Sequence, residues 1–327
     1  MGIGKIALAK LALGIGLLLP LSALGAEAPG AQWKPGKNMD MIVASGVGTA
    51  YDILARAMAR LWPKYFEVSL IVQNVSGAGG GLGVDRVAKA KPDGHVIGFM
   101  STSPYLSESI ESTFPWKIDD IPIFLAAATP PYVIVTGGNS PFKTWDDVRK
   151  SKRRVAMGST GRAVGDVPHL KDLIDHGVEV TTAVFGGTPA TMAAIQSGDA
   201  DLWSSVASIS IMEPIAAGQL RPLFLYATQR YPTLPDVPTH MEVGMAEEYK
   251  YITSMRLWFA PPKTPAPILA SLEARMTALL KDPEIEKWAK DNGLVDKIVS
   301  GGDAAKSAEG FVGILRKHFD IYQKYGG

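Results

Sequence analysis

The residues of this chain best suited to chemistry are glycines that precede helical segments. The stretch Ser76 to Gly94 reads SGAGGGLGVDRVAKAKPDG, a glycine-packed turn that runs directly into an amphipathic helix. Glycine has no side chain to block close approach, and the first turn of a helix offers unpaired N–H donors and the positive end of the macrodipole. The pattern indicates capture of a carboxylate or phosphate more than it indicates catalysis.

Nucleotide binding is the main rival interpretation of this stretch. The dinucleotide fingerprint needs the frame G-x-G-x-x-G, but counting from Gly77 or Gly79 the third position falls on Leu82 or Val84. No Gly-Lys-Ser/Thr follows, as a P-loop would require. Both nucleotide interpretations are therefore weakened.

Three further turns have the same character. Ser45 to Asp52 links a predicted strand to a predicted helix, so that the amides of the turn and the hydroxyls of Ser45 and Thr49 can face an anion. Later in the chain, Gly158 to Gly165 and Gly186 to Thr188 repeat the arrangement. Any one glycine here can be a simple turn residue. Four such turns at the carboxyl ends of strands favour a ligand site, because ligands dock at that edge of an α/β sheet.

Catalytic, metal and nucleic-acid functions lack support in the sequence. There is no cysteine, no Gly-x-Ser-x-Gly and no His-Glu-x-x-His, and His95 and His169 stand alone. We therefore expect no enzyme activity, no metal and no cofactor. With 33 basic and 32 acidic residues the net charge is +1, and the single short basic run, KSKRR at 150–154, offers no nucleic-acid surface.

The first residues are typical of a secretory signal peptide. Lys5 and Lys10 precede an apolar run from Leu11 to Leu19, which Pro20 and small residues near Gly25 follow. The run is shorter than the about 20 apolar residues of a membrane span. We expect residues 1–25 to be removed and the mature chain to be periplasmic.

Apolar runs alternate with helical periodicity through most of the chain, which predicts parallel sheets with covering helices. Expected strands and helices alternate in two series, which contain strands near 39–44, 68–73, 95–100, 155–157, 180–185, 201–206 and 222–227 and helices near 50–62, 82–90, 167–176, 189–196 and 209–217. From Thr264 onward the pattern is purely helical, with segments near 264–281, 284–292 and 304–325. Two α/β units joined by two chain crossings, near 129–139 and 229–239, imply a hinge.

Several segments together resemble one family, the Bug-type periplasmic receptors of tripartite tricarboxylate transporters. They read IVASGVGTAYDILAR from Ile42, the glycine-rich stretch from Ser76, FGGTPATMAAIQSGDAD from Phe185, AGQLRPL from Ala217, RYPTLPDVPTHMEVG from Arg230 and APPKTPAPI from Ala260. The resemblance covers nearly the whole mature chain, and six pieces in order make it specific.

The resemblance implies an α/β fold of the two-lobed, type II-like clamshell kind, each lobe a mostly parallel sheet flanked by helices. Lobe one is expected to comprise 32–131 and 236–327, and lobe two 132–235. The lobes of such receptors close on a small carboxylated ligand, bound mainly through backbone amides and water, and deliver it to membrane transporter subunits. We expect a monomer that binds a di- or tricarboxylate, with an aromatic carboxylate or an amino acid as alternatives and a membrane sensor as an alternative partner.

The chain departs from the family pattern at several positions that affect the ligand. Tyr51 brings an aromatic ring to a helix start, and Arg162 lies in a loop that is about two residues longer than usual, where its guanidinium suits a carboxylate. Asp52 would repel an anion, although in the family this position can meet a ligand amino group. The expected ligand-binding residues are Ser45, Gly48, Thr49, Tyr51, Asp52, Gly79, Ser101, Ser159, Thr160, Arg162, Phe185, Gly186, Gly187, Thr188 and Ser205.

Overall fold

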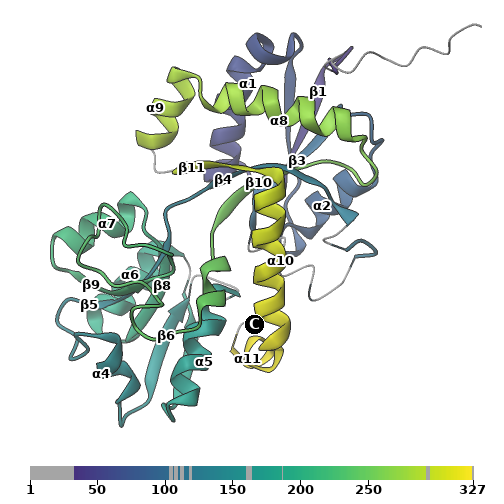
Figure 1. Cartoon of the computed structure of the whole chain (residues 1–327). Helices are drawn as coiled ribbons and strands as arrows, with labels where there is room; N and C mark the ends of the chain where they lie inside the picture. The colour runs from purple at the N-terminus through teal and green to yellow at the C-terminus, as the bar shows by residue number, and fades with distance from the viewer. Residues whose placement is uncertain are drawn as a thin grey trace, which may run out of the picture. The chain divides into compact units, whose positions relative to one another are not determined.

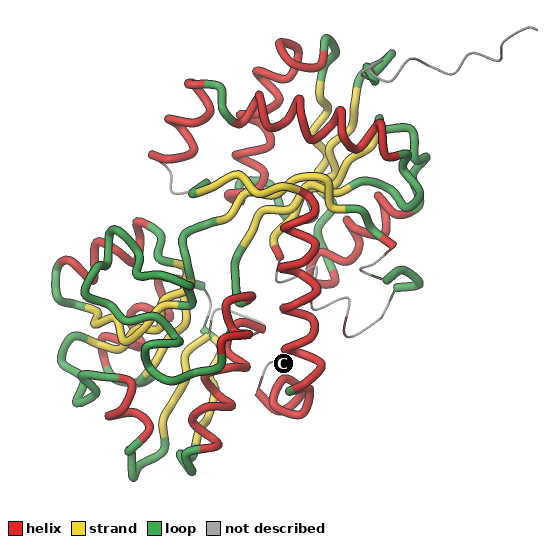
Figure 2. The backbone as a smooth tube through the Cα atoms, in the orientation of Figure 1, coloured by secondary structure: helices red, strands yellow, loops and turns green. Residues whose placement is uncertain are grey.

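A computed structural model of the chain describes residues 33–102, 106, 110, 114–117, 120–159, 164–185, 187–291 and 295–325. The expected signal peptide lies outside these residues. Two sheets with flanking helices make up the described part (Figures 1 and 2). No helix in these ranges combines the length and the apolar composition needed to cross a bilayer.

The first sheet contains six strands in the order β11-β4-β10-β3-β1-β2. Its strands are β1 (Met39–Val43), β2 (Leu70–Asn74), β3 (Val96–Ser101), β4 (Ile123–Ala128), β10 (Met255–Phe259) and β11 (Lys297–Ser300). β1 pairs in parallel with β2 and β3, whereas β10 is antiparallel to β3 and β4, and β11 is antiparallel to β4. Four of the six strands, β1 to β4, therefore run in one direction.

The second sheet contains five strands in the order β7-β6-β8-β5-β9. Its strands are β5 (Tyr132–Gly137), β6 (Val155–Ser159), β7 (Val180–Val184), β8 (Leu202–Val206) and β9 (Leu220–Leu225). Only β5 runs against the other four, because β6 is parallel to β7 and β8 while β5 is antiparallel to β8 and β9. The predicted fold, two mostly parallel α/β units in a two-lobed clamshell, is confirmed.

Helices cover both faces of the first sheet. The helices of this unit are α1 (Ala50–Phe66), α2 (Gly81–Ala88), α8 (Ala266–Leu280), α9 (Pro283–Asp291), α10 (Gly301–Lys317) and α11 (Phe319–Tyr325), together with the short 3₁₀ turn η1 (Ala78–Gly80). On one face Trp62, Phe66 and Met276 pack with Trp258 of β10, and on the other Val84 and Phe311 belong to a second buried cluster. This second cluster continues through Leu315 and Tyr322 to Leu170 of the other unit.

The second unit has shorter helices and a return segment. The helices are α4 (Trp145–Arg149), η3 (Val164–Asp166), α5 (Val167–Asp175), α6 (Thr188–Ser197) and α7 (Ile209–Ala216). The return segment leads from β9 back to the first sheet and contains η4 (Glu247–Tyr251). Its own core contains Val133, Ile195, Trp203 and Leu225. Gly177, Gly198 and Gly218 follow the ends of α5, α6 and α7 with positive φ, the conformation that glycine adopts readily after a helix.

Two expectations about elements were wrong. The C-terminal part is not purely helical, because Lys297–Ser300 forms β11, whose four residues are too few for a periodic pattern to reveal. Helix α1 also does not end at Trp62 but runs on to Phe66 with Pro63 inside it. Burial of Trp62 and Phe66 against the sheet, with their rings stacked at a centroid distance of 3.9 Å, favours this extra turn despite the missing N–H of proline.

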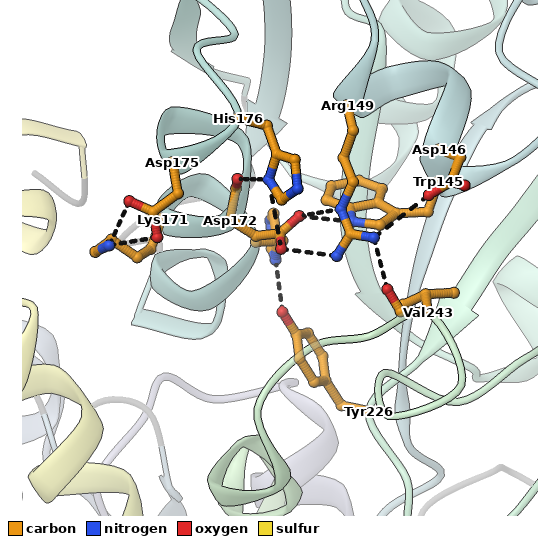
Figure 3. Close-up of polar contacts among 10 residues, drawn as sticks. Trp145, Asp146, Arg149, Lys171, Asp172, Asp175, His176, Tyr226 and Val243 are labelled. Carbon is orange, nitrogen blue, oxygen red and sulfur yellow. Dashed lines mark hydrogen bonds and ion pairs between the residues drawn. The ribbon is translucent and has the colours of Figure 1, made fainter.

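The ion pair between Arg149 and Asp172 links α4 and α5, and Arg149 also binds the return segment at Val243 (Figure 3). The guanidinium of Arg149 donates from Nε and Nη2 to the two carboxylate oxygens of Asp172, each at 2.8 Å, and from Nη1 to the Val243 carbonyl at 2.6 Å. The indole N–H of Trp145 donates to the same carboxylate at 2.8 Å. Helices α4 and α5 and the loop around Val243 are thus tied to one another by charge-assisted hydrogen bonds.

Candidate functional site

The predicted site residues lie at the carboxyl ends of three adjacent strands in each sheet. In the first unit, Ser45, Gly48 and Thr49 form the loop after β1, Tyr51 and Asp52 lie in the first turn of α1, Gly79 lies in η1 after β2, and Ser101 ends β3. In the second unit, Ser159 ends β6, Phe185 follows β7, Gly187 and Thr188 begin α6, and Ser205 lies within β8. Thr160, Arg162 and Gly186 lie outside the described residues.

The loop between β1 and α1 is held by the hydroxyl of Thr49. This hydroxyl donates to the Gly46 carbonyl at 2.9 Å, and it accepts from the Asp52 amide as the N-cap of α1. It also lies 2.8 Å from the Ser45 hydroxyl, which must be the donor because Thr49 has only one hydrogen to give. Both hydroxyl hydrogens are therefore used inside the loop and do not point to a ligand.

The carboxylate of Asp52 also serves the loop. It is 2 % exposed, and its oxygens accept from the Gly48 amide at 2.8 Å and from Arg56 Nε at 2.9 Å. Arg56 in turn donates to Asn74 at the end of β2. The Arg56 hydrogen bond, together with the Gly48 amide, holds the pKa of Asp52 below its usual value although burial acts to raise it. The Gly48 amide and the Asp52 carboxylate are thus already paired with each other.

The next two amides of the loop remain open. Among the described residues, nothing accepts a hydrogen bond from the backbone N–H of Thr49 or of Ala50. Both groups lie at the N-terminus of a 17-residue helix, where the macrodipole favours an anion. Val47, in the middle of the same loop, is 75 % exposed. The loop therefore offers two free donors next to an apolar side chain.

Tyr51 covers a buried arginine that the sequence reasoning missed. The ring of Tyr51 packs edge-on against Phe99 at a centroid distance of 5.6 Å, and the guanidinium carbon of Arg256 lies 5.4 Å from the Tyr51 ring centroid. Arg256, on β10 beside Ser101 of β3, is only 6 % exposed. Burial lowers the pKa of its guanidinium. The available signal was a charged residue within the otherwise apolar strand MRLWF.

The glycine-rich stretch is partly explained by packing. Helix α2 lies so close to β1 that a Cβ on Gly83 would come within 2.5 Å of the Ala44 Cβ and 2.7 Å of its Cα. A side chain at position 83 would therefore push the helix away from the sheet. Among the glycines of this stretch, Gly83 serves the fold, whereas Gly79 lies in η1, nearer the end of β2.

The facing loop of the second unit is also internally bonded. The Phe185 amide donates to the Ser159 carbonyl at 2.8 Å, and the Gly187 amide donates to the Phe185 carbonyl at 2.7 Å. Gly187 has φ 104°, which only glycine adopts readily, and it caps α6. The Gly187 amide is therefore bonded within the loop in this conformation, and replacement of Gly187 would strain the backbone.

A second buried polar cluster lies behind this loop. His169 is fully buried, its Nδ1 lies 3.1 Å from the Tyr226 hydroxyl, and its Nε2 lies 3.5 Å from Asp166 Oδ1. Burial lowers the pKa of His169 to about 3 and raises the pKa of Asp166 to about 7. Within the described ranges, no group of three or more histidine, aspartate or glutamate side chains is placed to hold a metal ion.

Comparison with known proteins shows to which family the chain belongs. Residues 54–310 match the family described as "Tripartite tricarboxylate transporter family receptor". Protein BugT of Bordetella pertussis is 25 % identical over 325 residues, which are 93 % of this chain and 95 % of that protein.

Similar folds are known from solved structures. A TctC solute binding protein from Polaromonas has a TM-score of 0.74 and 19 % identity, over 86 % of this chain and 99 % of that one. MatC from Rhodopseudomonas palustris with bound malate has a TM-score of 0.64 and 22 % identity, over 88 % and 99 %. An R. palustris protein with adipate has a TM-score of 0.66 and 20 % identity, over 88 % and 98 %. The family is one of solute receptors and not of enzymes, and this chain belongs to the tripartite tricarboxylate transporter receptor family.

Proposed function

We propose that this chain is an extracytoplasmic receptor that binds a small di- or tricarboxylate between its two lobes without converting it. The observation that carries the proposal is the pair of open amides, Thr49 and Ala50, at the N-terminus of α1 and at the carboxyl edge of the first sheet. The solved relatives with malate and with adipate support a dicarboxylate as the class of ligand. We take lobe one as 32–131 with 236–327 and lobe two as 132–235.

The ligand contacts are proposed from the open groups and not from the bonded ones. In lobe one they are the Thr49 and Ala50 amides, with Gly79 and Ser101 beside them; in lobe two they are Thr188 at the start of α6 and Ser205 on β8. Asp52 is assigned to the loop itself, because its carboxylate is buried and paired. The Asp52 carboxylate is therefore not available to an amino group of a ligand, which favours a dicarboxylate over an amino acid.

Delivery of the ligand to a membrane transporter is the second part of the proposal. The chain is taken to be exported with loss of residues 1–25 and to act as a monomer in the periplasm. Cells that lack the gene should lose uptake of the radiolabelled ligand and regain it when the full-length gene is restored. Normal uptake together with a lost chemotactic or transcriptional response would instead make the membrane partner a sensor.

A carboxylate screen tests the binding proposal. Malate, adipate, citrate, benzoate and glutamate are each added to the purified mature chain, and thermal unfolding and calorimetric binding are measured. A dicarboxylate or tricarboxylate at a hundredfold its dissociation constant should stabilise the fold by about 2.7 kcal/mol. Micromolar affinity corresponds to about 8 kcal/mol, which a handful of charge-assisted hydrogen bonds can supply.

The screen has outcomes that contradict the proposal. Preference for benzoate would replace it with an aromatic carboxylate receptor, and preference for glutamate with an amino acid receptor. Recovery of a chemically altered ligand after incubation would overturn the receptor assignment. A matched control is Ser69→Ala, at the opposite end of the first sheet before β2, which should leave the affinity unchanged.

A further inference from the structure

Arg256 is a buried cation with no hydrogen-bond or ion-pair partner among the described residues. Its Nε and Nη1 atoms are inaccessible and make no hydrogen bond, and no carboxylate of the described residues lies within ion-pair distance of its guanidinium. A buried and unpaired polar group lowers stability, and a buried charge does so more strongly. The fold keeps this charge without a partner among the described residues at the carboxyl edge of its first sheet, which points to a partner outside the described chain.

The residues around Arg256 show where a partner could bind its guanidinium. In the sheet, Arg256 is in register with Ser101, the last residue of β3, and with Ala127, the second-last residue of β4. These are carboxyl ends of strands, the edge at which the loop between β1 and α1 also lies. The guanidinium lies on the face covered by α1, because the Tyr51 ring of the first helical turn stands over it. The open amides of Thr49 and Ala50 directly precede Tyr51 in the chain.

The Tyr51 ring lies over the Arg256 guanidinium. The ring is half-buried, and the Tyr51 hydroxyl makes no hydrogen bond to any described residue. Ring contacts with Phe99 and Arg256 and packing against the cluster that contains Trp258 hold it. A cation under an aromatic face gains less than a guanidinium that forms charge-assisted hydrogen bonds with a carboxylate. Turning the ring aside costs little compared with what an oxyanion on Arg256 supplies.

We propose that one carboxylate of the ligand pairs with the Arg256 guanidinium and with the open amides of Thr49 and Ala50, and that Tyr51 turns aside to admit it. This inference rests on the proposed carboxylate function and adds to it a charged specificity residue. A guanidinium and two amides together favour a compact carboxylate with two free oxygens. The ligand is then recognised in lobe one by a charge and not by backbone amides alone.

The test compares Arg256→Met with a matched control. The probe is whichever of malate, adipate and citrate binds the unaltered chain most tightly, and its affinity is measured by calorimetry. Arg256→Met should lose at least about tenfold in affinity, as expected for a charge-assisted hydrogen bond. Without ligand, the variant should unfold at the same or a higher temperature, because an unpaired buried charge has been removed.

The control is Arg275→Met on α8. Arg275 is 9 % exposed and lies over an aromatic ring, that of Phe66, as Arg256 lies over Tyr51. Unlike Arg256 it has a partner, since it donates to the Tyr65 carbonyl at 2.6 Å. Arg275→Met should therefore lower the unfolding temperature and leave the affinity for the probe unchanged. If Arg256 had only a structural role, Arg256→Met would, like Arg275→Met, lower the unfolding temperature and leave the affinity for the probe unchanged.

The outcomes separate this inference from the function on which it rests. If the unaltered chain binds a carboxylate and Arg256→Met binds it equally well, the inference is overturned and the receptor function stands. If the unaltered chain binds none of the three probes, both are overturned. Should Arg256→Met not fold, the ¹⁵N signal of the Arg256 Nε–H in the unaltered chain decides. It should shift when the probe is added, and an unmoved signal at saturation overturns the inference.

Discussion

Two charged residues beside the start of α1 show what a sequence pattern can and cannot distinguish. Asp52 and Arg256 both lie near the predicted anion site, one as an apparent obstacle and the other unnoticed. In the structure the Asp52 carboxylate is paired with Arg56 and with the Gly48 amide and is no obstacle. Arg256, in contrast, has no partner among the described residues. The Asp52–Arg56 pair has the i, i+4 spacing of a helix and could be read from the sequence. The position of Arg256 depends on the pairing of β10 with β3, which local spacing does not record.

At the same scale, His169 should make stability depend on pH. Its folded-state pKa of about 3 lies below the unfolded value of about 6.5. The folded histidine stays neutral while the unfolded one takes up a proton, so its contribution is present above pH 6.5 and is lost as pH falls toward 3. The unfolding free energy of the unaltered chain minus that of His169→Asn should therefore shrink by about 2 kcal/mol from pH 7 to pH 5.

Urea denaturation at the two pH values measures this difference. Asp166 acts with the opposite sign, because a folded-state pKa raised to about 7 means that its contribution is lost as pH rises from 3.8 through 7. Asp166 is present in both proteins, and its effect largely cancels in the subtraction. If the difference in unfolding free energy between the unaltered chain and His169→Asn stays constant from pH 7 to pH 5, the His169 ring takes up a proton in the folded protein as it does in the unfolded one.

At the scale of elements, most helices and strands were predictable because their burial is periodic. The predicted strand near 39–44 and the predicted helix near 167–176 correspond closely to β1 and α5. The errors arose where packing between distant segments outweighs local preference. β11 exists because β4 has an open edge to pair with, and Pro63 lies within α1 because Trp62 and Phe66 are buried on either side of it.

The ion pair between α4 and α5 makes a prediction at this scale. Asp172→Asn removes the charge that pairs with Arg149, whose side chain is 12 % exposed, while Asp172 itself is 11 % exposed. Breaking a buried pair by removing one partner costs about 3 to 5 kcal/mol, and the remaining bonds of Arg149 place the expected loss near the lower value. Chemical denaturation of the variant measures this loss.

The control for this variant lies one helical turn away. Asp175 of α5 forms an exposed pair with Lys171, and Asp175→Asn should change the unfolding free energy by less than about 1 kcal/mol. Figure 3 shows that Asp172 accepts hydrogen bonds from Arg149 and Trp145, whereas Asp175 accepts from Lys171. The two variants remove the same charge from the same helix, but the Asp172 side chain is 11 % exposed and the Asp175 side chain 55 %. Equal effects would mean that the Arg149 pair contributes no more than a surface contact.

At the scale of the whole molecule, the division into two α/β units could be read from the sequence, whereas the composition of each sheet could not. The alternation of strands and helices indicated two series, and the structure confirms two sheets. The place of β10 between β3 and β4 had no local signal, because sheet order is decided by which edges remain unpaired. A charge within the apolar strand MRLWF marked Arg256 as unusual, but its place beside Tyr51 depends on this sheet order and could not be read from the sequence.

The late position of β10 in the chain also sets an order of assembly. The Thr102 hydroxyl at the end of β3 bonds to Met255, 153 residues away, whereas every strand of the second sheet comes from the continuous stretch 132–225. In a chain that emerges amino-terminus first, the second sheet can form while the first still lacks its middle strand. Contacts of such long range form slowly. The carboxyl edge of the first sheet, where we propose that the ligand binds, is therefore completed only after the second sheet, so we expect a chain that is interrupted before residue 255 to form the second sheet but to bind no ligand.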